Sequence, residues 1–231
     1  MRNSALRQIG SSEIDGKGKI MEEIKKLHTA ILEGDAQMAH EITEKALAAG
    51  IEPMQLVNDY MIPAMAEVGE RFECNDYFVP ELLIAARAMK SALTLVRPLL
   101  AASGAEPAGR VVLGTVKGDL HDIGKNLVAA MLEGNGFEVI DLGVNVAPEQ
   151  FIASVKEKGA NIVAMSALLT TTMPAMRTTI NALKEAGVRD QVKVLIGGAP
   201  ITQRYADEIG ADGFSDNAVG AVTVAKKILA A

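Results

Sequence analysis

The 231-residue sequence contains a single cysteine, no tryptophan and few aromatic residues of any kind. The lone Cys74 excludes an internal disulfide and favours a reducing, cytoplasmic setting. Aromatic residues make up only 3% of the chain and hydrophobic residues 49%, so we expect a core built from aliphatic side chains and methionine. This apolar content is sufficient for a packed globular core and argues against disorder.

The sequence also lacks long apolar runs and an excess of basic residues. No segment approaches the roughly 20 apolar residues of a membrane span, and the N-terminus lacks the apolar core of a signal peptide. The formal net charge of −6 argues against nucleic acid as a partner, because phosphate binding needs clustered Lys and Arg. We therefore expect a cytoplasmic protein with no membrane and no nucleic acid among its partners.

The N-terminal part of the chain has the hydrophobic spacing of helices. After a polar segment over residues 1–17, which we expect to be mobile, apolar residues recur at spacings of three and four from Ile20 to Ile31. Asp35 is placed to cap a second helix, Pro63 should kink or split a third, and Pro80 opens a fourth. Four helices with short connections predict a small bundle.

The composition changes at "LLAASGAEPAG", residues 99–109, which is rich in Ala, Gly and Pro and predicts a linker. The linker separates a helical bundle, residues 18–98, from a second domain, residues 110–231. In the second domain, apolar segments such as "RVVLGTV" alternate with helical segments such as "IGKNLVAAMLEGNG". Such alternation predicts an α/β fold with a parallel sheet covered on both faces. Five strands and five helices indicate a flavodoxin-like, Rossmann-like domain.

Ligands of such sheets bind beyond the carboxyl ends of the strands, so the residues that follow each strand are candidates for a site. The first strand is followed by "KGDLHDIG", which contains Asp119 and His121. A ligating His usually donates its other ring N–H to a carboxylate, but a single His cannot build a zinc site. His121 is therefore a candidate ligand for a metal already chelated in a macrocycle, as in haem proteins. The alternative is a solvated turn in which Asp119 or Asp122 caps the next helix.

Three motifs in register extend this pattern. "DLHDIG", "SAL" and "GG" occur in this order after the first, third and fourth predicted strands, and they resemble the D-x-H-x-x-G, S-x-L and GG motifs of cobalamin-binding domains. The helical segment over residues 67–93 resembles the cap that precedes this domain in methionine synthase and in the corrinoid proteins of anaerobic methyltransferase systems. The resemblance covers residues 19–231.

The resemblance implies a non-catalytic corrinoid methyl carrier of one-carbon metabolism that binds cobalamin base-off and His-on. The cofactor would cycle between cob(I)alamin, which takes a methyl group, and methylcobalamin, which gives it to an acceptor. The implied partners are a substrate-specific methyltransferase, a corrinoid:tetrahydrofolate or coenzyme M methyltransferase, and a reductive activating protein. The donor stays open among methanol, methylamines, betaines and aromatic methyl ethers, as do the acceptor and the oligomeric state.

The family's functional positions carry over to named residues. By resemblance, His121 is the axial cobalt ligand, Asp119 its hydrogen-bond partner, and Thr172 the hydroxyl that methionine synthases supply with Ser. Whether Thr172 completes this relay stays open, because Thr170 and Thr171 are its neighbours. Phe72 and Val79 match apolar residues that the family places over the methyl group, the alternative being ordinary bundle core. The other expected cofactor-binding residues are Asp122, Gly124, Thr115, Ser166, Leu168, Thr170, Gly197 and Gly198, whereas Lys117 and Lys125 are expected to face solvent.

Three other interpretations are compatible with parts of the pattern. The cobalamin-binding subunit of an adenosylcobalamin mutase shares D-x-H-x-x-G but normally lacks the helical cap. A cobalamin-based light sensor or regulator can share both halves but needs a DNA-binding domain, for which we see no spare length. A flavodoxin-like module without a corrin is the third, and a protein that ignores cobalamin would favour it.

Overall fold

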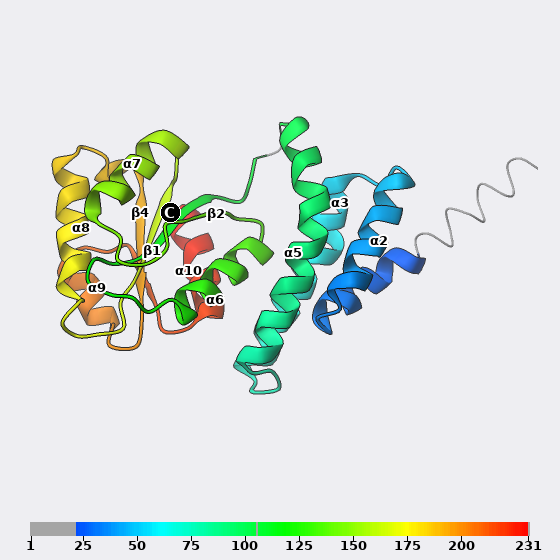
Figure 1. The fold of residues 1–231 in the computed structure, drawn as a ribbon, viewed down its shortest axis with the longest axis horizontal. Coiled ribbons are helices and arrows are strands. Elements are labelled where there is room, and N and C mark those ends of the chain that lie inside the picture. The colour runs from blue at the N-terminus through cyan, green and yellow to red at the C-terminus, as the bar shows by residue number, and fades with distance from the viewer. Residues whose placement is uncertain (1–21, 105, 231) are drawn as a thin grey trace, which may run out of the picture. The chain divides into compact units, whose positions relative to one another are not determined.

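The computed structural model describes residues 22–104 and 106–230, so the prediction for residues 1–17 lies outside the described residues. The chain divides into two compact units at the boundary between residues 105 and 106 (Figure 1). The two units are described separately below.

The described part of the first unit consists of helices and short connections. Residues 22–32 are helical. They are followed by α2 (Ala36–Ala48), α3 (Pro53–Leu56), the π-helical turn η1 (Val57–Met61), α4 (Ile62–Glu73) and α5 (Val79–Ala102). The helix α5 packs against α2, α3 and α4. It therefore forms the centre of the predicted bundle.

The predicted helix boundaries have local physical causes. The side chain of Asp35 accepts a hydrogen bond from the Met38 backbone N–H at 2.9 Å and caps α2, while Pro80 lies in the first turn of α5. Because Pro63 has no N–H to donate, the helix widens before it, and the Ile62 N–H donates to the Val57 carbonyl five residues back. The expected split at Pro63 is thus a π-helical turn within a continuous helical stretch.

Two predictions for the first unit are wrong in detail. Residues 99–102, expected in the linker, are the last residues of α5, because Leu and Ala are strong helix formers. Gly104, with a φ of +71°, follows the end of this helix. The helical spacing after Asp35 also predicts that Met38 and Ala49 are internal. Both are exposed, since the buried face of α2 runs through Ala39, Ile42, Thr43 and Ala46.

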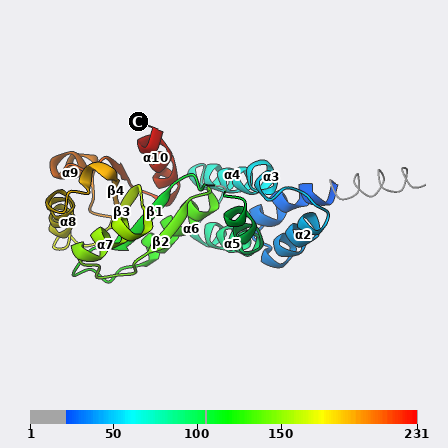
Figure 2. The ribbon, with the colours of Figure 1, turned by 90° about the horizontal axis from the view of Figure 1, so that it is seen from above.

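The second unit alternates strands and helices, as the sequence predicts. Its sheet consists of five parallel strands in the order β2-β1-β3-β4-β5 (Figure 2), which is the flavodoxin-like order. The elements along the chain are β1 (Arg110–Thr115), α6 (Ile123–Gly134), β2 (Glu138–Asp141), α7 (Pro148–Lys158), β3 (Ile162–Ser166), α8 (Pro174–Glu185), the short 3₁₀ helix η2 (Arg189–Gln191), β4 (Lys193–Gly197), α9 (Gln203–Ile209), β5 (Gly213–Ser215) and α10 (Ala218–Ala230).

Helices cover both faces of the sheet: α8 packs against α7 and α9 on one face, and α6 packs against α10 on the other (Figure 1). The central strands are accordingly buried and continuously apolar. The register aligns the last residues of four strands, so that Thr115, Ser166, Gly197 and Ser215 stand in a row at one edge. This carboxyl edge carries the motifs that the sequence singles out. No helix in the described ranges has the length and hydropathy to cross a membrane.

Candidate functional site

The loop between β1 and α6 presents an exposed imidazole on a buried carboxylate. The side chain of His121 is 51% exposed, whereas that of Asp119 is completely buried. His121 Nδ1 lies 2.7 Å from Asp119 Oδ1, and the His121 backbone N–H donates to the same oxygen at 3.1 Å. With its Nδ1 proton donated to the carboxylate, the imidazole keeps the lone pair of Nε2 available for a ligand bond.

The second oxygen of Asp119 is also hydrogen-bonded. The Thr172 hydroxyl donates to Oδ2 at 2.7 Å, and the Leu168 backbone N–H donates to it at 2.8 Å. Of the three neighbouring threonines, Thr172 is therefore the one that contacts Asp119, whereas Thr170 is exposed. Burial alone would raise the pKa of Asp119, but hydrogen bonds from Thr172, Leu168 and His121 outweigh it and hold that pKa well below its usual range.

Thr115, an expected cofactor-binding residue, supports the loop from beneath. Its side chain is buried, and its hydroxyl donates to the His121 backbone carbonyl at 2.7 Å. The Asp119 carboxylate and the Thr115 hydroxyl thus fix His121 through its ring, its N–H and its carbonyl.

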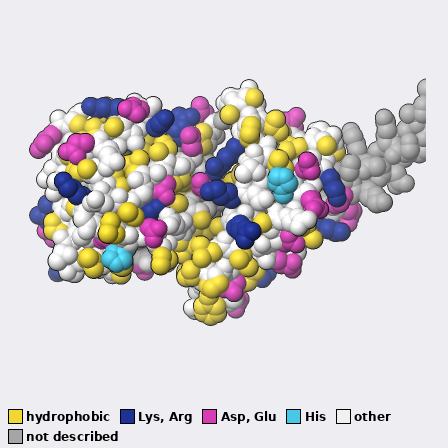
Figure 3. Space-filling model, viewed as in Figure 1, with side chains coloured by type: hydrophobic (Ala, Val, Ile, Leu, Met, Phe, Trp, Pro, Cys, Tyr) yellow, Lys and Arg dark blue, Asp and Glu magenta, His cyan; other side chains and the backbone are white. Residues whose placement is uncertain are grey.

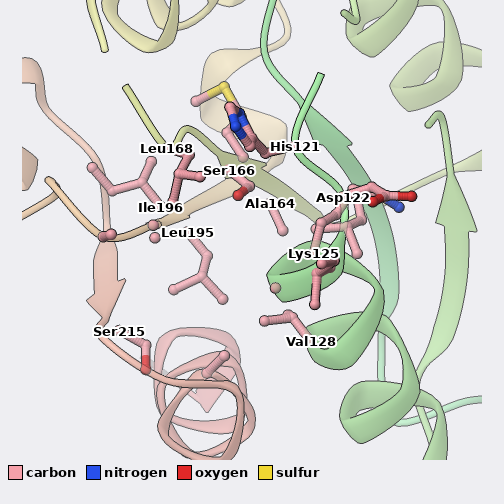
Figure 4. Close-up of a pocket in the computed structure, with 18 of the residues that line it drawn as sticks. His121, Asp122, Lys125, Val128, Ala164, Ser166, Leu168, Leu195, Ile196 and Ser215 are labelled. Atoms are coloured by element: carbon pink, nitrogen blue, oxygen red, sulfur yellow. The ribbon is translucent and has the colours of Figure 1, made fainter. Parts of the chain in front are cut away.

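A cavity of about 470 Å³ extends from His121 along the carboxyl edge of the sheet. Its walls come from the ends of β1, β3, β4 and β5 and from the first turns of α6 and α10. Figure 4 shows His121 at one end, with Val128 and Ser215 toward the other. Apolar side chains such as Leu113, Ala164 and Leu195 dominate the lining. The sequence-predicted residues on its walls are His121, Asp122, Gly124, Ser166, Leu168, Gly197 and Gly198.

The glycines at this edge of the sheet are each explained by a different steric constraint. Gly198 has a φ of +125°, and a Cβ there would lie 1.9 Å from the Ala167 carbonyl oxygen. A Cβ on Gly197 would lie 2.9 Å from the Ser215 carbonyl oxygen. At Gly124 a Cβ would meet no atom within 4 Å, so a side chain there would project into open space beside the cavity that this residue lines. The first two glycines permit close backbone approach, and Gly124 keeps space open.

Lys125 is buried, so the prediction that it faces solvent is wrong. Its side chain is only 2% exposed. Its ammonium group donates to Asp141 Oδ2 at 2.5 Å and to Asn126 Oδ1 at 2.6 Å. Since a buried cation needs a partner, the acid that ends β2, the neighbour of β1 in the sheet, was the feature of the sequence that could have indicated this pair.

The far end of the cavity is formed by residues that were not predicted from the sequence. Ser215, Asp216 and Asn217 line it, and the Gly220 backbone N–H donates to Asn217 Oδ1 at 2.7 Å at the start of α10. The rule that ligands bind beyond strand ends applies to β5 as to the other strands, and it would have found these residues.

Apolar side chains project into solvent on the loops that carry His121 and Leu168. Leu120 and Ile123 are 71% and 78% exposed, and Leu168 and Leu169 are 41% and 45% exposed. Exposed apolar groups gathered at one place indicate a binding surface. Around an exposed imidazole, they fit a broad and largely apolar ligand.

The donor set fits a metal that arrives with other ligands. Within residues 22–104 and 106–230, no group of three or more His, Cys, Asp or Glu side chains could hold a metal ion. A single imidazole beside a cavity of this size instead suits the metal of a macrocycle, with the cavity taking an appended group.

Phe72 and Val79 belong to the first unit. Phe72 is half-buried and Val79 is 40% exposed, at the start of α5. Phe78, Leu83 and Ile84 are also exposed here, and hydrophobic side chains gather around this end of α5 in Figure 3. The first unit therefore has an apolar surface of its own.

The chain was compared with known families, proteins and structures. It matches the B12 binding domain family over residues 109–223, and a second family of the same description over residues 23–97. It is 44% identical to trimethylamine corrinoid protein 1 of Methanosarcina acetivorans, covering 89% of this chain and 96% of that protein. It is 42% identical to the dimethylamine corrinoid protein of Methanosarcina barkeri, covering 90% and 97%.

Among solved structures, the chain resembles one from the methanol:cobalamin methyltransferase complex MtaBC of Methanosarcina barkeri. The identity is 31% and the TM-score 0.80, with 90% of this chain and 80% of that chain covered. These similarities span both units.

Proposed function

This chain belongs to the B12-binding family of corrinoid proteins, and from that premise we propose that it is a methyl carrier that binds cobalamin through His121. When bound, the cofactor supplies a cobalt centre that accepts a methyl group and gives it up again. The observation that carries the proposal is the exposed His121 imidazole held by the buried Asp119 carboxylate. A carboxylate behind a ligating imidazole fixes its tautomer and raises its basicity.

The chain's own residues have separable tasks in this proposal. Asp119 holds the proton on His121 Nδ1, so that Nε2 is the ligand atom. The cavity beside His121 would accept the nucleotide tail of the cofactor, and its apolar lining would exclude water from that part. Leu120, Ile123 and Leu168 would provide an apolar surface for the macrocycle.

The first unit supplies a cover for the opposite face of the cofactor in this proposal. Phe78 and Val79 project from the turn at the start of α5 with exposed fractions of 61% and 40%. Phe72 lies in the last turn of α4 and is half-buried. Apolar side chains there would shield a methyl group from water, as the family resemblance implies.

We further propose that the protein is a carrier without catalytic activity of its own, and that partner enzymes complete both transfers. A substrate-specific methyltransferase would load the methyl group. A second one would pass it to tetrahydrofolate or coenzyme M, and a reductive protein would restore the active cobalt state. The relatives' names contain trimethylamine, dimethylamine and methanol, which supports a choice of donor made by the partner enzyme.

The test is anaerobic reconstitution with cobalamin, followed by absorption spectroscopy of the wild type and His121→Ala. The wild type should bind one cobalamin per chain with a His-ligated spectrum, and His121→Ala should lose that spectrum. His40→Ala is the matched control, because His40 contacts the Ser91 carbonyl in the first unit and should leave the spectrum unchanged. A wild type that stays colourless would refute cobalamin binding, and an unchanged His121→Ala spectrum would refute the ligand assignment.

The carrier role has its own measurement. The reconstituted protein, reduced and mixed with a methyl donor and the matching methyltransferase, should show one spectral conversion per bound cobalt. Trimethylamine, dimethylamine and methanol, each with its own methyltransferase, form the first panel. If a panel widened to betaines and aromatic methyl ethers also gave no conversion, the carrier role would be contradicted.

A further inference from the structure

Asn145 has an unusual backbone beside the His121 loop. It lies in the connection between β2 and α7 and has a φ of +53°. In the described part of the chain, the residues other than glycine with positive φ are Asn75 and Asn145. Left-handed backbone is disfavoured for residues with a Cβ, although Asn tolerates it better than most. Such a residue persists where its surroundings hold it in place.

The contacts of Asn145 lie on the chain just before His121. The Gly118 backbone N–H donates to Asn145 Oδ1 at 2.8 Å. The Asn145 backbone N–H donates to the Asp119 carbonyl at 2.9 Å. Asn145 thus holds the Gly118–Asp119 segment through two hydrogen bonds, one from its side chain and one from its backbone. It makes both while its backbone is left-handed.

The residues next to Asn145 make further contacts between the connection after β2 and the segment after β1. The regular pairing of β1 with β2 ends at Leu113 and Asp141. Beyond it, Val146 forms an isolated bridge with Val116, and the Val146 N–H donates to the Thr115 carbonyl at 2.9 Å. The connection after β2 therefore continues alongside the segment before His121 as far as Val146.

We propose that Asn145 is a positioning residue for His121. It fixes the main chain at Gly118 and Asp119, while Thr172 and Leu168 fix the Asp119 side chain. The carboxylate and the imidazole are thereby held in place before any ligand binds, and a preorganised group binds more tightly because less freedom is lost on binding. The consequence for cobalamin rests on the proposed function, whereas the consequence for the loop does not.

The first experiment measures amide hydrogen exchange in the cofactor-free full chain. Asn145→Gly tolerates the positive φ and keeps the backbone N–H, so it removes the side-chain acceptor without straining the backbone. Exchange over residues 117–122 should accelerate about fivefold, as expected for the loss of one hydrogen bond. Asn145→Asp keeps an oxygen acceptor and should retain wild-type exchange. Asn75→Gly makes the same change in the first unit and should leave residues 117–122 unaffected.

The second experiment adds cobalamin and measures both affinity and absorption spectrum. Asn145→Gly should bind about fivefold more weakly and show a smaller His-ligated fraction, while Asn145→Asp should match the wild type in both. Wild-type exchange in Asn145→Gly would overturn the proposal. Faster exchange with an unchanged spectrum and affinity would also overturn it, because Asn145 would then order the backbone of residues 117–122 without positioning His121 for its ligand. If the wild type itself bound no cobalamin, the proposed function would fail, and the exchange data would still decide whether Asn145 positions the loop.

Discussion

In the second unit, the loop after β1 is organised around Asp119, a fully buried carboxylate that accepts hydrogen bonds at both oxygens. In the first unit, the loop between α4 and α5 is organised around Arg71, whose side chain is 39% exposed. Each loop leads into a surface with exposed apolar side chains. The two units therefore support similar surfaces with polar networks that differ in burial.

The network of the first unit consists of contacts on the bundle surface. Arg71 donates to Glu67 Oε1 from Nη2 at 2.6 Å and from Nε at 3.1 Å. Its guanidinium lies 5.1 Å from the ring centroid of Tyr77, and the Tyr77 hydroxyl donates to the Leu32 carbonyl at 3.2 Å. These contacts attach the turn before Phe78 to the helices.

Burial decides what the loss of a partner costs. A donor that loses its acceptor inside the protein keeps the full penalty of its desolvation, whereas a donor near the surface can turn to water. The Asp119 network should therefore be rigid and sensitive to substitution, and the Arg71 network adaptable. This difference suits the metal ligand that we propose in the second unit and the adaptable apolar cover that we propose in the first.

The largest predicted effect is that of Asp119→Ala. It leaves the Leu168 N–H without its acceptor and leaves the Thr172 hydroxyl only the Leu169 carbonyl, 2.9 Å away. We expect the free energy of unfolding of the second unit to fall by about 3 kcal/mol. This loss is measured by urea unfolding, monitored through hydrogen exchange in the strands of the second unit. The exposed Asp207, which accepts a hydrogen bond from Gln203, provides the control: Asp207→Ala should stay within about 0.5 kcal/mol of wild type. Equal losses of stability from the two substitutions would contradict the conclusion that burial makes the Asp119 network sensitive to substitution.

The next effect concerns the buried Lys125. Asp141→Ala removes the carboxylate that pairs with it, and a buried charge without its partner is costly. Because the Asp141 side chain is 38% exposed, we expect a loss of about 2 kcal/mol, below the usual range for fully buried pairs. Adding Lys125→Met should recover most of that loss, since an apolar side chain replaces the unpaired charge. No recovery in the double variant, measured by urea unfolding, would show that the cost lies elsewhere.

The fold could be predicted from sequence because its signals are local. Continuously apolar strands alternating with helices indicate the parallel sheet. Asp35 and Pro80 mark helix starts that the structure has, whereas Pro63 marks a π-helical turn instead of a break. The end of α5 was misplaced because Leu99–Ala102 combine small residues, typical of linkers, with strong helix formers. In such a segment, composition alone does not separate a linker from a helix end.

The site was predictable only where a motif marks it. Asp119, His121 and Gly198 stand in short motifs at strand ends, which the sheet rule makes candidates. Asn145 and the Lys125–Asp141 pair depend on the order of β1 and β2 in the sheet and on a connection that continues past their pairing. Such contacts join residues far apart in the sequence, and only the register of the sheet brings them together.

The contribution of the Asp119 network to stability should depend on pH. Asp119 has a lowered pKa in the folded state, so it stabilises the cofactor-free protein above the unfolded value of about 4. As the pH falls below that value, the stabilisation should be lost at about 1.4 kcal/mol per pH unit until the folded group is protonated. Asp119→Asn removes this contribution, so the stability difference from wild type should shrink between pH 4 and pH 2. A difference that stays constant over this range would contradict the role of the ionised carboxylate.

The smallest predicted effect is that of Tyr77→Phe in the first unit. The substitution removes the hydroxyl that donates to Leu32 and accepts from Arg71 Nη1 at 3.2 Å, but it keeps the ring beneath the guanidinium. We expect a loss of about 1 kcal/mol or less, because water can replace partners at a half-exposed site. Tyr60→Phe is the control, and proteolysis in the turn over residues 74–78 should accelerate only in Tyr77→Phe. A loss as large as that of Asp119→Ala would mean that this turn is held as rigidly as the His121 loop, and the difference between the two networks would not exist.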